Sequence, residues 1–174
     1  ETLRAGADEA VTQLKASGAE ICILSGDSSE RVANIARQLD VDFLASCQPK
    51  DKLARLQQAQ RAGAKVMAIG DGLNDAPLLS AADVSVAVAS ATALTKAQAD
   101  FVIAEGDLTA LITIVSTAKR CRRIIRQNLY WADGYNLIGI PFASAGFVAP
   151  LLAAIGMSLS SLIVVLSARR LRRG

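Results

Sequence analysis

Residues 65–77 read KVMAIGDGLNDAP, and this stretch decides the fold. Its apolar run, bounded by glycine, predicts a strand over residues 65–70 that is buried on both faces. The turn that follows puts Asp71 at the carboxyl end of this strand, which is where open α/β sheets bind ligands. Asp75 stands where it can cap the next helix, with Pro77 in the first turn. The alternative is an ordinary turn, because glycine, aspartate and asparagine are common turn residues.

Oxygen ligands are concentrated in this turn. Asp71, Asn74 and Asp75 supply two carboxylates and an amide close together in the chain. Such oxygens suit a hard cation such as Mg²⁺, which usually keeps a substrate phosphate as a further ligand. We therefore expect a Mg²⁺ site at this edge of the sheet, with Asp71 and Asp75 as its candidate protein ligands.

Strands and helices alternate through the first part of the chain. Apolar runs between turn residues predict further strands at residues 20–24, 41–45, 83–88 and 99–103. Amphipathic patterns predict helices at residues 7–16, 28–39 and 49–62. This alternation is typical of βαβ units with right-handed crossovers. We therefore predict an α/β fold over residues 1–118, a parallel sheet with helices on both faces.

Residues 119–174 differ from the rest in charge and hydropathy. They hold nine Lys or Arg and one acidic residue, Asp133, whereas residues 1–118 are net acidic. Residues 129–149 and 151–168 form two apolar runs, each long enough to cross a hydrocarbon layer of about 30 Å. Basic clusters lie before the first run and after the second, so the positive-inside rule predicts a transmembrane hairpin with both ends cytoplasmic.

Two other interpretations of this basic, apolar segment are weaker. One is a buried helical hairpin of a soluble protein, which does not account for two consecutive runs with matched basic ends. The other is a nucleic-acid surface, but basic residues that adjoin apolar runs fit lipid headgroups better. We therefore expect a lipid bilayer as a partner and no nucleic acid.

Composition narrows the chemistry further. The chain has no histidine, which excludes histidine-ligated metal sites and histidine general bases. Its cysteines, Cys22, Cys47 and Cys121, form no Cys-x-x-Cys pair, so we expect buried, reduced thiols. Glu1 stands where a start methionine would be, so we expect the segment to come from a longer protein.

Two further motifs are expected at the same edge of the sheet as Asp71. Ser25-Gly26-Asp27 follows the strand predicted at residues 20–24 and offers a hydroxyl and a free backbone N–H to an anion. Lys52 lies at the start of the helix predicted at residues 49–62, and its ammonium can neutralise a phosphoryl oxygen. Taken singly, Ser25 is an ordinary helix cap and Lys52 an ordinary surface residue. Together with metal carboxylates they are what phosphoryl transfer requires.

In this order the motifs resemble those of the P-type ATPases, whose phosphorylation domain has the haloacid-dehalogenase fold. Residues 25–27 stand where that family has Thr-Gly-Asp, residues 49–52 resemble its Pro-x-x-Lys, and residues 70–75 match its Gly-Asp-Gly-x-Asn-Asp. The resemblance covers essentially the whole chain. It assigns residues 1–118 to the C-terminal half of the phosphorylation domain and residues 119–174 to the last two transmembrane helices.

The resemblance implies Mg²⁺-dependent aspartyl-phosphate chemistry. The catalytic residues that it implies are Ser25, Gly26, Asp27, Lys52 and Asn74. Asp71 would ligate Mg²⁺ with support from Asp75, and Gly70 and Gly72 would belong to the cofactor site. ATP would be bound mainly by a domain outside this chain.

The apolar segment is similar to the copper-transporting, heavy-metal branch of the family. The candidate transport residues are Tyr135, Asn136, Met157, Ser160 and Ser161. A methionine thioether and an asparagine amide within a membrane suit soft Cu(I) better than zinc, and polar groups there are costly unless they are used. The alternative is that the methionine fills a gap and the serines let helices pack closely. The zinc branch would have an aspartate in the last helix, and this chain has none there.

The implied function is therefore ATP-driven Cu(I) export across the bacterial inner membrane. Its implied partners are the rest of the pump, the bilayer, the copper ion and a copper chaperone. Ser25 in place of threonine resembles the subgroup that serves haem–copper oxidase assembly. The Asp-Lys-Thr-Gly motif is absent from the chain, so the segment alone is expected to be inactive. The rival hypotheses are a truncated haloacid-dehalogenase-type phosphatase and a non-catalytic, membrane-anchored module.

Overall fold

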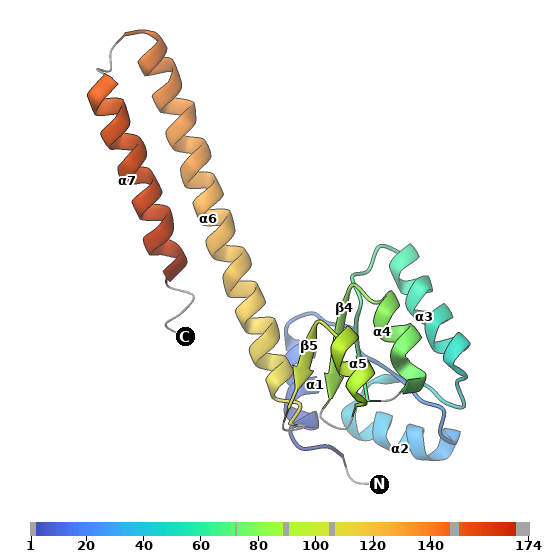
Figure 1. The fold of residues 1–174 in the computed structure, drawn as a ribbon. Helices are drawn as coiled ribbons and strands as arrows, with labels where there is room; N and C mark the ends of the chain where they lie inside the picture. Colours follow the sequence, from blue (N-terminus) through green and yellow to red (C-terminus); the bar gives the residue numbers. More distant parts are fainter. Residues whose placement is uncertain (1–2, 72, 89–90, 105–106, 147–149, 170–174) are drawn as a thin grey trace. The chain divides into compact units, whose positions relative to one another are not determined.

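The computed structural model divides the chain into two compact units, Glu1–Ile112 and Thr113–Gly174, which are described separately (Figure 1). The residues that it describes are 3–71, 73–88, 91–104, 107–146 and 150–169.

The first unit contains parallel strands in two groups. Strand β1 (Cys22–Leu24) pairs with β2 (Asp42–Leu44). Strand β4 (Val84–Val88) lies between β3 (Met67–Gly70) and β5 (Phe101–Ile103). The predicted parallel α/β fold is thus confirmed, with the difference that, among the described residues, the strands form two separate sheets.

Helices follow the strands, as the sequence pattern predicts. Those of the first unit are α1 (Ala7–Ala16), α2 (Ser29–Leu39), α3 (Pro49–Arg61), α4 (Ala76–Ala81) and α5 (Ala93–Gln98), with a 3₁₀ turn, η1, at Leu73–Asp75. The start of α3 shows why a helix boundary can be predicted from the sequence. The backbone N–H of Gln48 donates to Asp51 Oδ2 at 2.9 Å, which completes a capping box in front of Pro49.

The core of the first unit lies against β3 and β4. One cluster joins β3 to α3 and α4 through Ala68, Leu56, Leu78 and Leu79. A second cluster consists of Val86, Ile103 and Leu111. Because four of the five residues of β4 are buried, this strand is the centre of the unit and fixes the position of its neighbour β3.

Two predictions of burial are wrong. The Cys22 thiol on β1 is exposed, and β3 is not buried on both faces, because Ile69 is 40% exposed. Among the described residues each of these strands is paired on one side alone, which leaves part of it uncovered. The thiols are free, as expected, but they are not buried, because Cys47 and Cys121 are also partly exposed.

The second unit is a helical hairpin. Helix α6 (Ala110–Ser144) begins at the end of the first unit, and α7 (Pro150–Ala168) returns alongside it (Figure 1). The turn that the sequence predicts near residues 147–153 falls partly outside the described residues. Within the part of the chain that the structure describes, no helix combines the length and the apolar character needed to cross a membrane.

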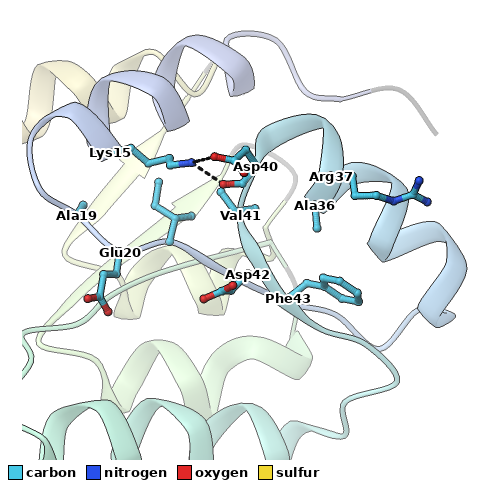
Figure 2. Close-up of a pocket in the computed structure, with 10 residues that line it drawn as sticks. Lys15, Ala19, Glu20, Ala36, Arg37, Asp40, Val41, Asp42 and Phe43 are labelled. Atoms are coloured by element: carbon cyan, nitrogen blue, oxygen red, sulfur yellow. Dashed lines mark hydrogen bonds and ion pairs between the residues drawn. The ribbon is translucent and has the colours of Figure 1, made fainter.

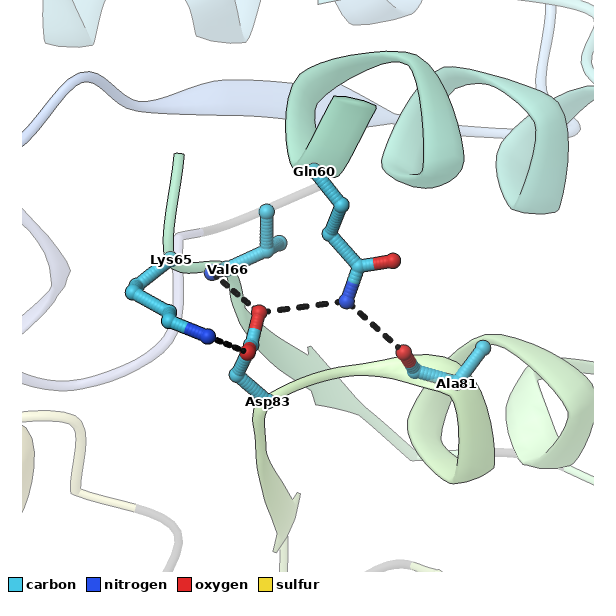
Figure 3. A network of polar contacts seen from close by, with 5 residues as sticks. All are labelled: Gln60, Lys65, Val66, Ala81 and Asp83. Atoms are coloured by element: carbon cyan, nitrogen blue, oxygen red, sulfur yellow. Dashed lines mark hydrogen bonds and ion pairs between the residues drawn. The ribbon is translucent and has the colours of Figure 1, made fainter. Parts of the chain in front are cut away.

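Asp83 precedes β4 and joins four elements of the first unit (Figure 3). Because Asp71 follows the parallel strand β3, the two aspartates lie at opposite ends of the sheet. Its Oδ1 accepts a hydrogen bond from Lys65 Nζ at 2.8 Å. Its Oδ2 accepts from the Val66 backbone N–H at 3.0 Å and from Gln60 Nε2 at 3.1 Å. Gln60 Nε2 also donates to the Ala81 carbonyl at 3.0 Å. These bonds connect the end of α3 to the starts of β3 and β4 and to the end of α4.

We expect Asp83→Asn to destabilise the chain in a pH-dependent manner. The hydrogen bonds from Lys65, Val66 and Gln60 hold the pKa of Asp83 well below its ordinary value. A carboxylate with a lowered folded-state pKa stabilises fully above its unfolded pKa of about 4, and this contribution is lost as the pH falls further. Chemical unfolding should therefore separate wild type from Asp83→Asn at neutral pH and progressively less in acid. Asp42→Asn, an exposed control on β2, should differ little from wild type in its free energy of unfolding at every pH. If the difference in free energy of unfolding between wild type and Asp83→Asn does not change with pH, this account is contradicted.

Candidate functional site

The motif residues of the first unit meet at one cavity. It has a volume of about 270 Å³ and lies at the carboxyl ends of β1 and β3. The residues that line it are Gly26, Cys47, Pro49, Lys52, Asp71, Asn74 and Asp75. Each of the three sequence motifs thus contributes at least one residue to the same cavity.

Lys52 and Asp75 form an ion pair beside this cavity. Lys52 Nζ lies 2.7 Å from Asp75 Oδ1, and both side chains are only 15% exposed. The expectation that Asp75 caps the following helix is wrong, because in the described structure its side chain makes no capping hydrogen bond to α4. A mostly buried ammonium nearby is a stronger partner for this carboxylate than a backbone N–H.

Gly70 makes room for this pair. A Cβ at Gly70 would lie 2.9 Å from the Asp75 Cβ and 3.2 Å from its Oδ2, which is closer than side chains pack. The structural requirement for glycine at the end of β3 is therefore the approach of Asp75 to the strand. Gly72, the other glycine predicted for a cofactor site, lies outside the described residues.

Asp71 is paired with a residue that the sequence analysis missed. Arg4 Nη2 lies 2.7 Å from Asp71 Oδ2, and the two side chains are about half exposed. Arg4 precedes the first predicted element and belongs to none of the motifs considered, so nothing in its local sequence indicated this contact. The pair shows that the Asp71 carboxylate lies where a cation can reach it.

The Ser-Gly-Asp loop after β1 is held by its own hydrogen bonds. Ser25 Oγ accepts from the Asp27 backbone N–H at 3.1 Å, so this N–H is already engaged. Asp27 Oδ1 lies 3.7 Å from Arg31 Nη1. The Cys47 backbone N–H donates to the Ser25 carbonyl at 2.9 Å, which joins the loops after β1 and β2. Gly26 is the residue of this loop that lines the cavity.

The donor atoms at the cavity are of the chemical type that Mg²⁺ prefers. Asp71, Asn74 and Asp75 present hard oxygen atoms, and Mg²⁺ usually takes one or two carboxylates and completes its shell with water and phosphate oxygens. In the described part of the chain, no three acidic or cysteine side chains gather as a ready metal cage. The arrangement therefore suits a cation that shares its ligands with a phosphate.

A larger cavity of about 460 Å³ lies between α1, α2 and β2 (Figure 2). Across it Lys15 Nζ donates to the Asp40 carbonyl at 2.5 Å and to Asp40 Oδ2 at 2.6 Å. Asp40 ends α2 in a left-handed conformation, with φ of 52°. The hydrogen bond from Lys15 lowers the pKa of Asp40. No motif residue is among the described residues that line this cavity.

The transport candidates lie on both helices of the second unit. Tyr135 and Asn136 belong to α6, and Met157, Ser160 and Ser161 belong to α7. Tyr135 and Ser160 are partly buried, whereas the other three are exposed. Trp131, which the sequence analysis did not select, donates from Nε1 to Ser160 Oγ at 3.1 Å.

Comparison with known proteins agrees with this geometry. Residues 1–83 match the family model for haloacid dehalogenase-like hydrolases. The chain is 40% identical over 174 residues to the copper-exporting P-type ATPases of Staphylococcus aureus strains JH9 and Newman. This match covers 99% of the chain but 22% of each relative, so the chain spans about a fifth of their length.

Solved structures give the same result. A zinc-transporting PIB-type ATPase in its E2.Pi state is 32% identical, with a TM-score of 0.93 over 98% of this chain and 28% of that protein. The catalytic domain of the CPx-ATPase CopB-B is 34% identical, with a TM-score of 0.58 over 62% of this chain and 43% of that domain.

The first unit thus has the haloacid dehalogenase-like fold, and its cavity lies at the carboxyl ends of β1 and β3, the edge at which α/β sheets bind ligands. The predicted resemblance to heavy-metal P-type ATPases is confirmed over nearly the whole chain.

Proposed function

We propose that this chain is part of an ATP-driven P-type ATPase that exports Cu(I), and that it supplies one side of the phosphoryl pocket and a membrane hairpin. The observation that carries the proposal is the convergence of three motifs, represented by Gly26, Lys52 and Asp71, on one cavity. A hydrolase of another kind would not need these motifs in this order followed in the chain by a helical hairpin.

Each residue at the cavity has a definite task in this proposal. Lys52 lies at the cavity with its side chain mostly buried, where its ammonium neutralises a phosphoryl oxygen. The backbone at Gly26 approaches the phosphoryl group closely because it has no side chain. Asp71 and Asn74, with Asp75, hold Mg²⁺, which when bound offsets the charge that develops in phosphoryl transfer.

The phosphorylated aspartate would come from a strand outside this chain. Strands β1 and β3 are parallel to their own partners, and the loops that follow both of them line the cavity. In the described residues β1 and β3 do not pair with each other. A further parallel strand between them would pair with both and would end at the cavity, where its first loop residue would face Lys52 and Asp71.

We also propose that α6 and α7 enter a bacterial inner membrane, with both ends of the segment cytoplasmic. Large apolar side chains are exposed on both helices, among them Leu137, Ile138, Leu162 and Val165. Exposed apolar surface of this extent is typical of a membrane or partner interface. The basic cluster at residues 119–126 suits anionic headgroups. The structural match to the zinc-transporting ATPase covers both helices.

Copper is the cargo that the sequence favours. The chain is 40% identical to the copper exporters and 32% identical to the zinc transporter. Helix α7 has Met157 and serines but no aspartate, and a thioether suits Cu(I). A copper chaperone as donor and a role in haem–copper oxidase assembly stay predictions.

A complete pump that contains this segment should form phosphoenzyme in response to Cu(I) and not to zinc. Met157→Ala should weaken Cu(I) activation by about tenfold, the lower end of the range for losing one group that supports a metal site. Leu159→Ala, on the same helix, is the matched control and should leave activation unchanged. Phosphoenzyme that forms equally without Cu(I), or an unchanged Cu(I) response in Met157→Ala, would contradict the assignment.

A further inference from the structure

Trp131 and Ser160 connect the two helices of the hairpin. The indole Nε1 of Trp131 on α6 donates a hydrogen bond of 3.1 Å to Ser160 Oγ on α7. An indole N–H can only donate, so the serine oxygen must be the acceptor. Trp131 is the single tryptophan of the chain, and the tryptophan emission therefore comes from this residue alone.

A second contact between the same helices involves Tyr135 and Gly156. A Cβ at Gly156 would lie 2.5 Å from Tyr135 Oη and 3.5 Å from its Cζ. The phenol therefore rests on the backbone of Gly156, and any side chain at this position would displace it. Glycine at this position therefore allows the close approach of Tyr135, whereas a Cβ at Gly134 on α6 would meet nothing within 4 Å.

The two contacts define one register. Trp131 and Tyr135 are one helical turn apart on α6, and Gly156 and Ser160 are one turn apart on α7. Because the helices are antiparallel, each residue of one pair meets its counterpart in the other. Sliding either helix by a turn would break both contacts together. Tyr135 and Ser160 are proposed transport residues, and Met157 adjoins Gly156.

We propose that Trp131 and Gly156 are positioning residues for the Cu(I) transport site, and that Ser160 is the hydrogen-bond partner of Trp131 and not a copper ligand. This inference rests on the proposed function. The Ser160 oxygen is engaged by an indole N–H, and a hydroxyl is in any case a poor ligand for soft Cu(I) compared with the thioether of Met157. Ser161 lies about 100° further around the helix and is therefore outside this contact.

The hydrogen bond can be tested without metal. In the 174-residue chain in detergent micelles, Ser160→Ala should shift the emission maximum of Trp131, because the indole loses its acceptor. Ser160→Thr, which keeps the hydroxyl, should restore the wild-type spectrum. Ser161→Ala is the matched control and should leave emission unchanged. Equal spectra for Ser160→Ala and wild type would overturn the inference.

The positioning role is tested by Cu(I) titration of the same chain under reducing conditions. Trp131→Phe and Ser160→Ala should each weaken Cu(I) binding by about tenfold, as the loss of a supporting hydrogen bond does at other metal sites. The double variant should lose no more than either single variant, since both remove one interaction. Gly156→Ala should also weaken binding by displacing Tyr135, whereas Gly134→Ala should not.

Two results separate this inference from the proposed function. If the wild-type chain binds Cu(I) but the losses from Trp131→Phe and Ser160→Ala simply add, the two side chains act independently and the inference is wrong. If the wild-type chain does not bind Cu(I), the proposed transport site is refuted and the positioning role fails with it, whatever the emission spectra show.

Discussion

Asp71→Asn is expected to reduce Mg²⁺-dependent phosphoenzyme formation in a complete pump by about 100-fold, the scale of losing one preorganised electrostatic partner of a transition state. The asparagine keeps the shape of the side chain but removes the charge that Mg²⁺ requires. Because the expected defect is in metal binding, raising the Mg²⁺ concentration should restore part of the lost rate. The measurement is the amount of phosphoenzyme as a function of Mg²⁺.

Asp42→Asn is the control for this variant, since Asp42 is an exposed carboxylate on β2 outside the phosphoryl cavity. It should behave as wild type at every Mg²⁺ concentration. Arg4 neutralises the Asp71 carboxylate in this structure, so we expect Mg²⁺ to displace Arg4 when it binds. If Asp71→Asn forms phosphoenzyme at the wild-type level, the assignment of Asp71 as a Mg²⁺ ligand is contradicted.

Lys52→Met should destabilise the chain by about 2 kcal/mol, within the range for a hydrogen bond to a charged group. The methionine keeps the aliphatic stem but leaves the Asp75 carboxylate, which is 15% exposed, without its ammonium partner. An uncompensated, mostly buried charge costs more than the pair itself contributes. Chemical unfolding of the chain in detergent, followed by circular dichroism, measures the change in the free energy of unfolding.

Two comparisons make this measurement decisive. Lys50→Met changes an exposed lysine in the same helical turn and should have little effect. Lys52→Met combined with Asp75→Asn should be less destabilised than Lys52→Met alone, because the unpaired charge is then gone. If Lys50→Met and Lys52→Met are equally stable, the ion pair has no structural importance.

Local patterns allowed most of the fold to be predicted. The helix expected at residues 7–16 is α1, and the strand expected at 65–70 contains β3. Such elements are encoded by hydrophobic periodicity and by caps that lie within a few residues of each other. Burial was less predictable. The exposure of Cys22 and Ile69 depends on which strands pair beside them, and this is decided by distant segments.

At the candidate site, too, local motifs were predicted from the sequence and contacts between distant residues were not. The order of the motifs predicted a cavity with Lys52 and Asp71, and the structure has one. The pairing of Arg4 with Asp71 joins residues 67 positions apart, and that of Lys52 with Asp75 joins residues 23 apart. No local pattern encodes such contacts, because they depend on how helices and loops approach one another in space. The contact of Trp131 with Ser160 was missed for the same reason.

The most direct test of the central claim is a structure of a complete pump with Mg²⁺ and a phosphate analogue bound. We expect Mg²⁺ at about 2.1 Å from an Asp71 oxygen, the usual Mg²⁺–oxygen distance, with Lys52 in hydrogen-bond contact with the analogue and Arg4 released. An analogue bound elsewhere, with Asp71 still paired to Arg4, would contradict the account.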